Sequence, residues 1–353
     1  MSSLRLASLV AAAAVVPAGL ASAASLSAPT TAQMVGQLVV AAMPGKVPSA
    51  SFLARIRHGQ AGSVILFSAN FGPAGPSALA AELQAVAKAG GQPPLLVMVD
   101  QEGGIVKRLP GAPTIGAPAM TDPAVARAQG AATAANLARN GVNVDLAPVM
   151  DIGRGGFITS RTFGGTPADV AARATAFAQG LASGGVVATG KHFPGLGWAM
   201  TNTDNAATVI HAARPAILAD LQPYRVATAA GLPMVMVSTA VYPGLGVKIP
   251  AATSRIVVGS LLRGQLGFKG VVITDDLNTP AIHAYSTTSA AAVRAVSVGV
   301  DLILAGGTGG PTVDGGSAAV YAALLQAVQS GTLPQTTVAA AYARVMKLKA
   351  SLP

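Results

Sequence analysis

The chain has no cysteine, and it is poor in aromatic (4%) and charged (10%) residues. Without cysteine it can form no disulfide, offers no thiolate to a metal, and has no site for a lipid behind a cleaved leader. Its four histidines are dispersed and form no H-x-x-x-H pair, so the sequence predicts no metal site. The 51% hydrophobic content argues against disorder and predicts a large buried core.

Acidic residues are especially scarce, with 13 carboxylates against 23 basic residues and a formal charge of +10. The basic residues are scattered singly, without a Lys/Arg run or interleaved aromatics. Nucleic acid is therefore not a predicted partner. The charge is compatible with a mild attraction to anionic polymers of a cell envelope.

Residues 1–24 have the layout of a secretory signal peptide, with Arg5, an apolar run over 9–16 and small residues at 21–23. A membrane anchor is the alternative, but the run is short and Pro17 and Gly19 interrupt it. No later stretch reaches the length of a membrane span free of charge, glycine and proline. We therefore expect a mature domain over 25–353 without a transmembrane span, either secreted or periplasmic.

Short apolar runs alternate with Ala-rich helical stretches along the mature chain. Eight such runs begin near residues 37, 63, 94, 142, 186, 233, 270 and 299. Continuous apolar runs are typical of parallel strands buried on both faces, and eight strand–helix units predict a single-domain α/β fold, a (β/α)8 TIM-type barrel. A doubly wound open sheet is the alternative, but no GxGxxG turn follows the first run. The stretch 337–353 is predicted to form a final helix that covers the barrel.

Several of the few acids lie at one predicted edge. Asp100, Asp151, Asp275 and Asp276 come at or just after the ends of predicted strands, and Asp204 lies on the loop after the fifth. A single acid there would be expected to cap a helix, but in this fold the loops after the strands form the active site. Several acids on one rim therefore predict a polar small-molecule site, and four basic side chains join them: Arg108, Arg161, Lys191 and His192.

This set of side chains suits a sugar. A retaining glycosidase needs a nucleophile and a proton donor on either side of the scissile bond. Asp275, directly after the run GVVIT, is the natural nucleophile. Its neighbour Asp276 is expected to cap or orient, because consecutive strand residues point in different directions.

The same segments carry a family resemblance. VDQEGG, SRTFGGTP, KHFPG and GFKGVVITDDL occur in order within roughly residues 35–280. With them the chain resembles glycoside hydrolase family 3, in its single-domain β-N-acetylglucosaminidase (β-hexosaminidase) branch. The resemblance implies retaining hydrolysis of terminal N-acetylglucosamine from cell-wall fragments or chitin-type oligosaccharides, through a glycosyl-aspartate intermediate and without a cofactor. A β-glucosidase-type specificity stays open, and we expect a monomer.

The resemblance also implies individual roles. Asp275 matches the catalytic nucleophile. Five residues match substrate-binding positions: Asp100, Arg108, Arg161, Lys191 and His192. For Lys191 and His192 the alternative is a buried polar pair that braces the barrel rim.

The loop after KHFPG departs from the family pattern. This branch typically has KHFPGHG followed by an Asp-Ser-His element, whose Asp–His pair acts as acid and base. Here Leu196 replaces the glycine-flanked histidine, and the later element contains Asp204 but no histidine. The nearest substitute in sequence, His211, comes seven residues later, where a surface position is expected.

Three explanations of this departure stay open. Asp204 itself acts as the general acid, with its pKa raised by apolar neighbours such as Trp198 and Met200. Or the enzyme is slow and limited to good leaving groups or to an acceptor other than water. Or the chain is a catalytically impaired, glycan-binding pseudoenzyme.

The sequence also offers a different chemistry. The GGTGG segment at 306–310 could hold a phosphate, and Lys191 could then be a Schiff-base amine. This hypothesis leaves Asp100 and the TDDL block without a role.

Overall fold

A computed structural model describes residues 28–72, 75–306 and 316–353, so the predicted signal peptide lies outside the described residues. Eight parallel strands form one sheet in the order β10-β1-β2-β3-β6-β7-β8-β9. They are β1 Val39–Ala42, β2 Ser63–Ile65, β3 Leu96–Val99, β6 Val144–Asp145, β7 Val187–Phe193, β8 Met234–Val237, β9 Val271–Thr274 and β10 Ile303–Ala305. Each of the eight predicted runs contains one of these strands.

The sheet closes on itself. The strand β1 pairs with β10 on one side and with β2 on the other. A bridge between Ile273 and Leu302 then joins β9 to β10, and the Thr274 N–H donates to the Leu302 carbonyl at 3.0 Å. This closure confirms the (β/α)8 barrel and makes the doubly wound alternative wrong.

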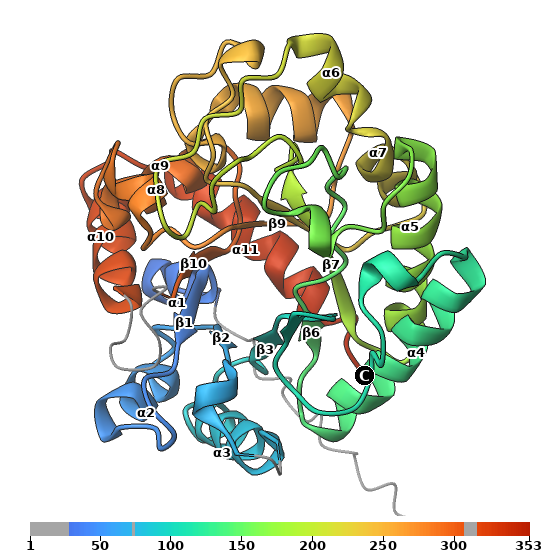
Figure 1. The fold of residues 1–353 in the computed structure, drawn as a ribbon. Coiled ribbons are helices and arrows are strands. Elements are labelled where there is room, and N and C mark those ends of the chain that lie inside the picture. Colours follow the sequence, from blue (N-terminus) through green and yellow to red (C-terminus); the bar gives the residue numbers. More distant parts are fainter. Residues whose placement is uncertain (1–27, 73–74, 307–315) are drawn as a thin grey trace, which may run out of the picture.

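Helices surround the ring of strands (Figure 1). They are α1 Thr31–Gln37, α2 Ala50–Arg57, α3 Ser77–Ala89, α4 Pro123–Arg139, α5 Pro167–Ser183, α6 Arg214–Ala219, α7 Gln222–Ala229, α8 Pro280–His283, α9 Thr288–Ser297, α10 Ser317–Gln329 and α11 Gln335–Lys349, with a π-helix η6 at Arg255–Gln265. Their ends follow local signals: Thr166 and Asp169 form a capping box before α5, and Gly184 ends it. None of the described helices is long and apolar enough to cross a membrane.

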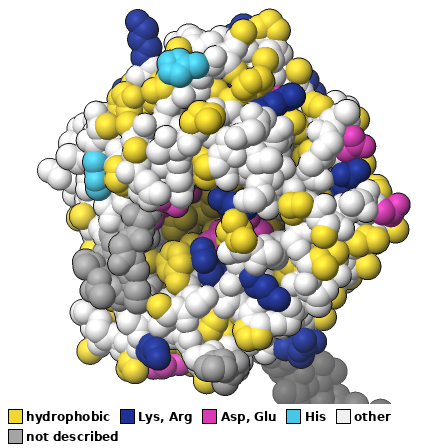
Figure 2. Space-filling view, in the orientation of Figure 1, with side chains coloured by type: hydrophobic (Ala, Val, Ile, Leu, Met, Phe, Trp, Pro, Cys, Tyr) yellow, Lys and Arg dark blue, Asp and Glu magenta, His cyan; other side chains and the backbone are white. Residues whose placement is uncertain are grey.

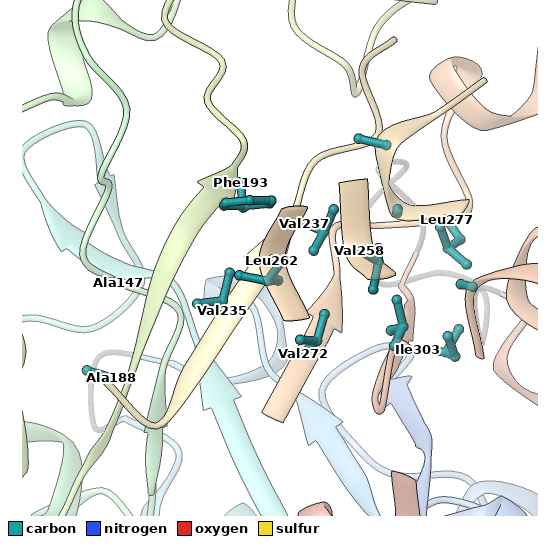
Figure 3. Close-up of a cluster of buried hydrophobic side chains, with 14 of the residues drawn as sticks. Ala147, Ala188, Phe193, Val235, Val237, Val258, Leu262, Val272, Leu277 and Ile303 are labelled. Atoms are coloured by element: carbon teal, nitrogen blue, oxygen red, sulfur yellow. The ribbon is translucent and has the colours of Figure 1, made fainter. Parts of the chain in front are cut away.

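Two layers of apolar side chains pack on the two sides of the barrel wall. Outside, side chains of the strands pack against the helices, as where Val258 and Leu262 of η6 lie over Val235 and Val272 (Figure 3). Inside, alternate residues of every strand fill the barrel, including Val40, Met98, Val144, Met234, Ile273 and Leu304. Strands buried on both faces explain why the runs were continuous rather than alternating.

The last helix closes one end of the barrel. Val345 and Leu348 of α11 belong to the cluster of side chains that fills the barrel interior. Arg344 of α11 donates to buried Asp301 at 2.8 Å, just before β10. The predicted covering helix is thus confirmed, and the opposite end of the barrel is left for the site.

One strand pair was not predicted. After β3 the chain forms an antiparallel hairpin, β4 Gln101–Gly103 with β5 Val106–Lys107. Buried Gln101 holds it together: its side-chain amide donates to the Leu109 and Ala112 carbonyls at 2.9 Å, and its oxygen accepts from the N–H groups of Arg108 and Leu109.

Candidate active site

A cavity of about 420 Å³ opens at the ends of the strands opposite to α11. Its floor is the top of the barrel interior, formed by Ile65, Leu146, Met236 and Leu304. Figure 2 shows the hollow near the middle of this face, with acidic and basic side chains in it. The seven residues that were predicted to act in catalysis or substrate binding all line it: Asp100, Arg108, Arg161, Lys191, His192, Asp204 and Asp275. Of the other two rim acids, Asp276 lines it and Asp151 does not.

Lys191 is the centre of an ion network on one wall. Its Nζ lies 2.7 Å from Asp100 Oδ1 and 2.7 Å from Glu102 Oε1. Glu102 accepts a second, bidentate contact from Arg161, at 2.9 Å from Nε and 2.6 Å from Nη2. On the outer side Arg108 Nη2 lies 3.4 Å from Asp100 Oδ2. The Lys191–His192 peptide bond is cis, and both side chains line the cavity.

The network keeps its charges at neutral pH. Burial alone would raise the pKa of Asp100, but the charges of Lys191 and Arg108 hold that pKa well below its ordinary value. Burial alone would lower the pKa of Lys191, but the two carboxylates raise it instead. A Schiff-base amine must be able to lose its proton, so this environment contradicts the aldolase-type hypothesis. The other half of that hypothesis, the loop at 306–310, lies almost wholly outside the described residues.

His192 is held by a carboxylate of the preceding strand's loop. Its Nδ1 lies 2.7 Å from Asp151 Oδ2, and both groups are buried. Burial would raise the pKa of Asp151, but the charge and the hydrogen bond of His192 hold it below its ordinary value. The pair fixes the ring at the cavity wall. Both readings of His192 are therefore compatible with the geometry: it braces the rim and also faces the cavity.

Asp275 and Asp276 follow β9, and their side chains lie in different surroundings, as the sequence predicts. The Asp275 N–H continues the ladder by donating to the Val237 carbonyl at 2.8 Å, and its side chain is only partly buried at the cavity. Asp276 is buried, and its Oδ1 accepts from the N–H groups of Asn278 (2.8 Å) and Gly306 (3.1 Å). Asp276 therefore joins Gly306, directly after β10, to the segment that follows β9.

Asp204 shares the cavity with Asp275, and both side chains are partly buried there. Burial raises the pKa of Asp204, and the negative charge of Asp275 raises it further. Trp198 and Met200, the apolar neighbours suggested from sequence, are exposed, and neither lines the cavity. His211 is exposed and also lies outside the cavity lining, so it is not a substitute for the missing histidine.

The family follows from comparison with known proteins. The profile described as "Glycosyl hydrolase family 3 N terminal domain" matches residues 30–348. The chain belongs to glycosyl hydrolase family 3. This confirms the resemblance read from the motifs and places the chain among the glycoside hydrolases.

Three relatives illustrate the family match. An "Uncharacterized secreted glycosyl hydrolase" of Arthroderma benhamiae is 35% identical over 91% of this chain and 94% of its own length. A β-N-acetylglucosaminidase from a Paenibacillus species superposes with a TM-score of 0.86 and 35% identity over 92% of this chain. The present chain covers only 63% of the length of the Paenibacillus chain. A β-N-acetylhexosaminidase from Beutenbergia cavernae gives a TM-score of 0.80 and 35% identity over 92% of this chain and 99% of its own.

Three side chains of this family 3 site were not predicted from the sequence. Glu102, inside the VDQEGG motif, joins Lys191 to Arg161 from a buried position. Asn202 accepts from the Asp204 N–H at 3.1 Å and lines the cavity. Asp145 lies beneath the network. Of the three, only Glu102 could have been found from the sequence, because an acid inside the VDQEGG motif is a natural partner for the basic residues of the other site motifs.

Asp145 is fully buried, and only one of its oxygens is bonded. Its Oδ1 accepts from the Gln101 N–H at 3.0 Å, while Oδ2 has no hydrogen-bond partner among the described residues. Burial, aided by the charges of Asp100 and Glu102, raises the pKa of Asp145 to about 8. The family 3 protein thus carries a neutral carboxylic acid beneath its ion network at pH 7.

This environment gives a stability prediction. Between an unfolded pKa of about 4 and the folded value of about 8, the folded state holds a proton that the unfolded state has lost. Wild-type stability should therefore fall relative to that of Asp145→Asn as pH rises from 5 to 8, because the amide keeps the Gln101 bond without titrating. Urea unfolding of both proteins across this range measures the difference. A constant difference would contradict a neutral Asp145.

No group of three or more His, Asp or Glu side chains in the described part of the protein is arranged to hold a metal ion.

Proposed function

We propose that the chain is an exported, retaining β-N-acetylhexosaminidase that releases terminal N-acetylglucosamine from cell-wall fragments or chitin-type oligosaccharides. One observation carries the proposal: two carboxyl groups, Asp275 and Asp204, line one polar cavity, and burial together with the charge of Asp275 raises the pKa of Asp204. In retaining glycosidases such a pair divides into nucleophile and proton donor. The names of the similar β-N-acetylglucosaminidase and β-N-acetylhexosaminidase support the sugar.

In the first step Asp275 acts as the nucleophile. One of its oxygens bonds to the anomeric carbon as the bond from that carbon to the leaving oxygen breaks. Asp204 gives its proton to the leaving oxygen. Burial and the charge of Asp275 favour the protonated form of Asp204 before this step, because both raise its pKa.

In the second step a water molecule displaces Asp275 from the anomeric carbon. Asp204, now ionised, takes a proton from that water, and the sugar leaves with its original configuration. In the covalent intermediate Asp275 is an ester without charge, so it no longer raises the pKa of Asp204. This change favours the ionised form of Asp204 that the second step needs, although burial still raises its pKa.

The ion network binds the sugar that is being transferred. Asp100 presents a carboxylate that can accept hydrogen bonds from hydroxyl groups, and Lys191 and Arg161 present donors beside it. Their mutual ion pairs fix these groups before substrate arrives, so little side-chain ordering remains to be done on binding. The adjacent apolar floor would face the sugar ring.

Export rests on the first 24 residues and on the secreted relative. A periplasmic or extracellular location would bring the protein to the proposed polymers. Detecting a mature protein that begins near residue 25 in the culture medium or periplasm checks this part of the proposal separately from the activity.

The activity is tested with nitrophenyl β-N-acetylglucosaminide and the matching β-glucoside, with the product's configuration followed by NMR. We expect turnover of the first substrate, little of the second, and a first-formed β-anomer. A preference for the glucoside would indicate β-glucosidase specificity. Glycan binding without turnover of either substrate would indicate the pseudoenzyme instead.

Asp204→Asn tests the proton donor. For a substrate with a poor leaving group, such as a second sugar, we expect kcat/KM to fall by about a hundred- to ten-thousand-fold. For nitrophenyl glycosides the loss should be smaller, because nitrophenolate leaves without a proton. Equal losses for both substrates would contradict the role. Undiminished hydrolysis of the poor substrate would assign the proton transfer to another group at the cavity, such as His192, which is bonded to Asp151.

A further inference from the structure

The segment that carries Asp204, residues 195–210, is called here the acid loop. At its start it is bonded to two neighbours on the barrel. The Leu196 N–H donates to Asp151 Oδ1 at 2.7 Å, and the Tyr242 hydroxyl donates to the Gly195 carbonyl at 3.1 Å. Both partners are buried. The loop therefore leaves β7 along a fixed path.

Trp198 provides the next attachment. Its indole N–H donates to Asp220 Oδ2 at 3.0 Å, and the Arg154 guanidinium lies 5.3 Å from the centre of the ring. Arg154 and Asp220 also form an ion pair, at 2.5 Å between Nη2 and Oδ1. These three side chains come from the acid loop, the loop after β6 and the end of α6, and Asp220 is buried. We call them the tryptophan clamp.

Two glycines let the backbones of the loops after β6 and β7 touch beside this clamp. A Cβ atom on Gly197 would lie 1.8 Å from the Ile152 carbonyl oxygen, and one on Gly156 would lie 2.1 Å from the Ala199 oxygen. The Phe157 N–H donates to that same Ala199 oxygen at 3.1 Å. Glycine is thus required for contact at both positions.

Beyond Asp204 the acid loop is attached again. The Val241 N–H donates to the Thr208 carbonyl at 2.9 Å, and the Ile210 N–H donates to the Val241 carbonyl at 2.8 Å. Asn202 accepts from the Asp204 N–H at 3.1 Å. The loop is therefore attached on both sides of the carboxyl group before any substrate is present.

We propose that the tryptophan clamp is a positioning device that holds Asp204 in place over the cavity, so that the acid loop does not have to close on substrate. This inference rests on the proposed function, in which Asp204 transfers the proton. Trp198, Arg154 and Asp220 touch neither substrate nor reacting atoms in it. They act through the loop backbone, and an error of about 1 Å in the place of a reacting group costs about a hundred-fold in rate.

The first test separates positioning from simple structural support. Trp198→Phe keeps an aromatic ring beneath Arg154 and removes the indole N–H, which donates a hydrogen bond to Asp220. We expect kcat/KM to fall about ten- to a hundred-fold for a disaccharide and much less for the nitrophenyl glycoside, the pattern of Asp204→Asn. A variant that only unfolds part of the protein would lower both rates equally.

The pH profile gives a second readout. Burial raises the pKa of Asp204, so a loosened and better solvated loop should let that pKa fall toward its ordinary value. The alkaline limb of kcat/KM should then move to lower pH in Trp198→Phe. Arg154→Ala should move it in the same direction, whereas Arg139→Ala, which removes an exposed cation at the end of α4, should leave it in place.

The third readout does not use activity. Trp198 is the single tryptophan of the chain, so its fluorescence reports the acid loop alone. We expect saturating N-acetylglucosamine to leave its emission maximum and its quenching by acrylamide unchanged, and Asp220→Asn to increase the quenching. A large change on adding the sugar to the wild type would show that the loop moves to the ligand and would overturn the proposal.

The two hypotheses fail differently. Wild-type turnover with equal disaccharide and nitrophenyl losses in Trp198→Phe overturns the clamp and leaves the proposed function intact. Absence of wild-type turnover overturns both. If Trp198→Phe does not fold, Arg154→Ala carries the same comparison, since Arg154 is exposed and its loss leaves the indole bond to Asp220.

Discussion

Asp275→Asn is expected to lower kcat/KM for nitrophenyl β-N-acetylglucosaminide by about ten-thousand-fold or more. An amide cannot form the glycosyl ester, and a good leaving group does not remove the need for a nucleophile. The fold should be unaffected, because the amide oxygen of D275N can still accept from the Asp276 N–H, at 2.9 Å in the wild type. Steady-state kinetics and the thermal midpoint of the same preparation provide the measurement.

The neighbouring acid is the matched control. Asp276→Asn removes a charge one residue away but keeps an oxygen for the N–H groups of Asn278 and Gly306. It should lose far less activity than D275N. If instead D276N is the inactive variant and D275N retains activity, the assignment of nucleophile and capping acid is reversed.

Lys191→Met is expected to give the largest loss of stability, about 3–5 kcal/mol in the free energy of unfolding. The reason is the pair of buried or partly buried carboxylates that it leaves behind: Asp100 and Glu102 each lie 2.7 Å from the ammonium group. Arg161 still pairs with Glu102, but Asp100 then keeps only the longer contact to Arg108. Urea unfolding measures the loss.

Two comparison variants sharpen this result. Lys269→Met removes an exposed ammonium group and should change the free energy of unfolding by no more than about 0.5 kcal/mol. Adding Asp100→Asn to Lys191→Met should recover part of the loss, because it removes the carboxylate left unpaired. Additive losses in that double variant would show that the Lys191–Asp100 pair does not stabilise the fold.

The sequence was most informative where burial dictates composition. The eight strands were predictable because a strand packed on both faces is mostly apolar, as the run Val271, Val272 and Ile273 of β9 is. The rim acids were predictable for the opposite reason, since a carboxylate such as Asp275 directly after such a run has to face the open end of the barrel.

Contacts between distant loops could not be predicted. Glu102 meets Arg161, which is 59 positions away, and Trp198 meets Asp220 across 22 positions. Neither separation matches the short repeat of a helix or a strand, so no local sequence pattern indicates these contacts. The hairpin β4–β5 was missed because a buried glutamine side chain, Gln101, holds it, rather than an apolar pattern. The raised pKa of Asp145 likewise depends on what surrounds it in space.

The position of α11 has a consequence for how the protein is made. Its side chains Val345 and Leu348 complete the barrel interior, and β10, which joins β9 to β1, precedes it by only about thirty residues. A chain synthesised as far as residue 300 therefore lacks both the strand that closes the ring and the helix that seals its end. Such a chain cannot finish its core, so the barrel can fold only after this last strand and helix have been made.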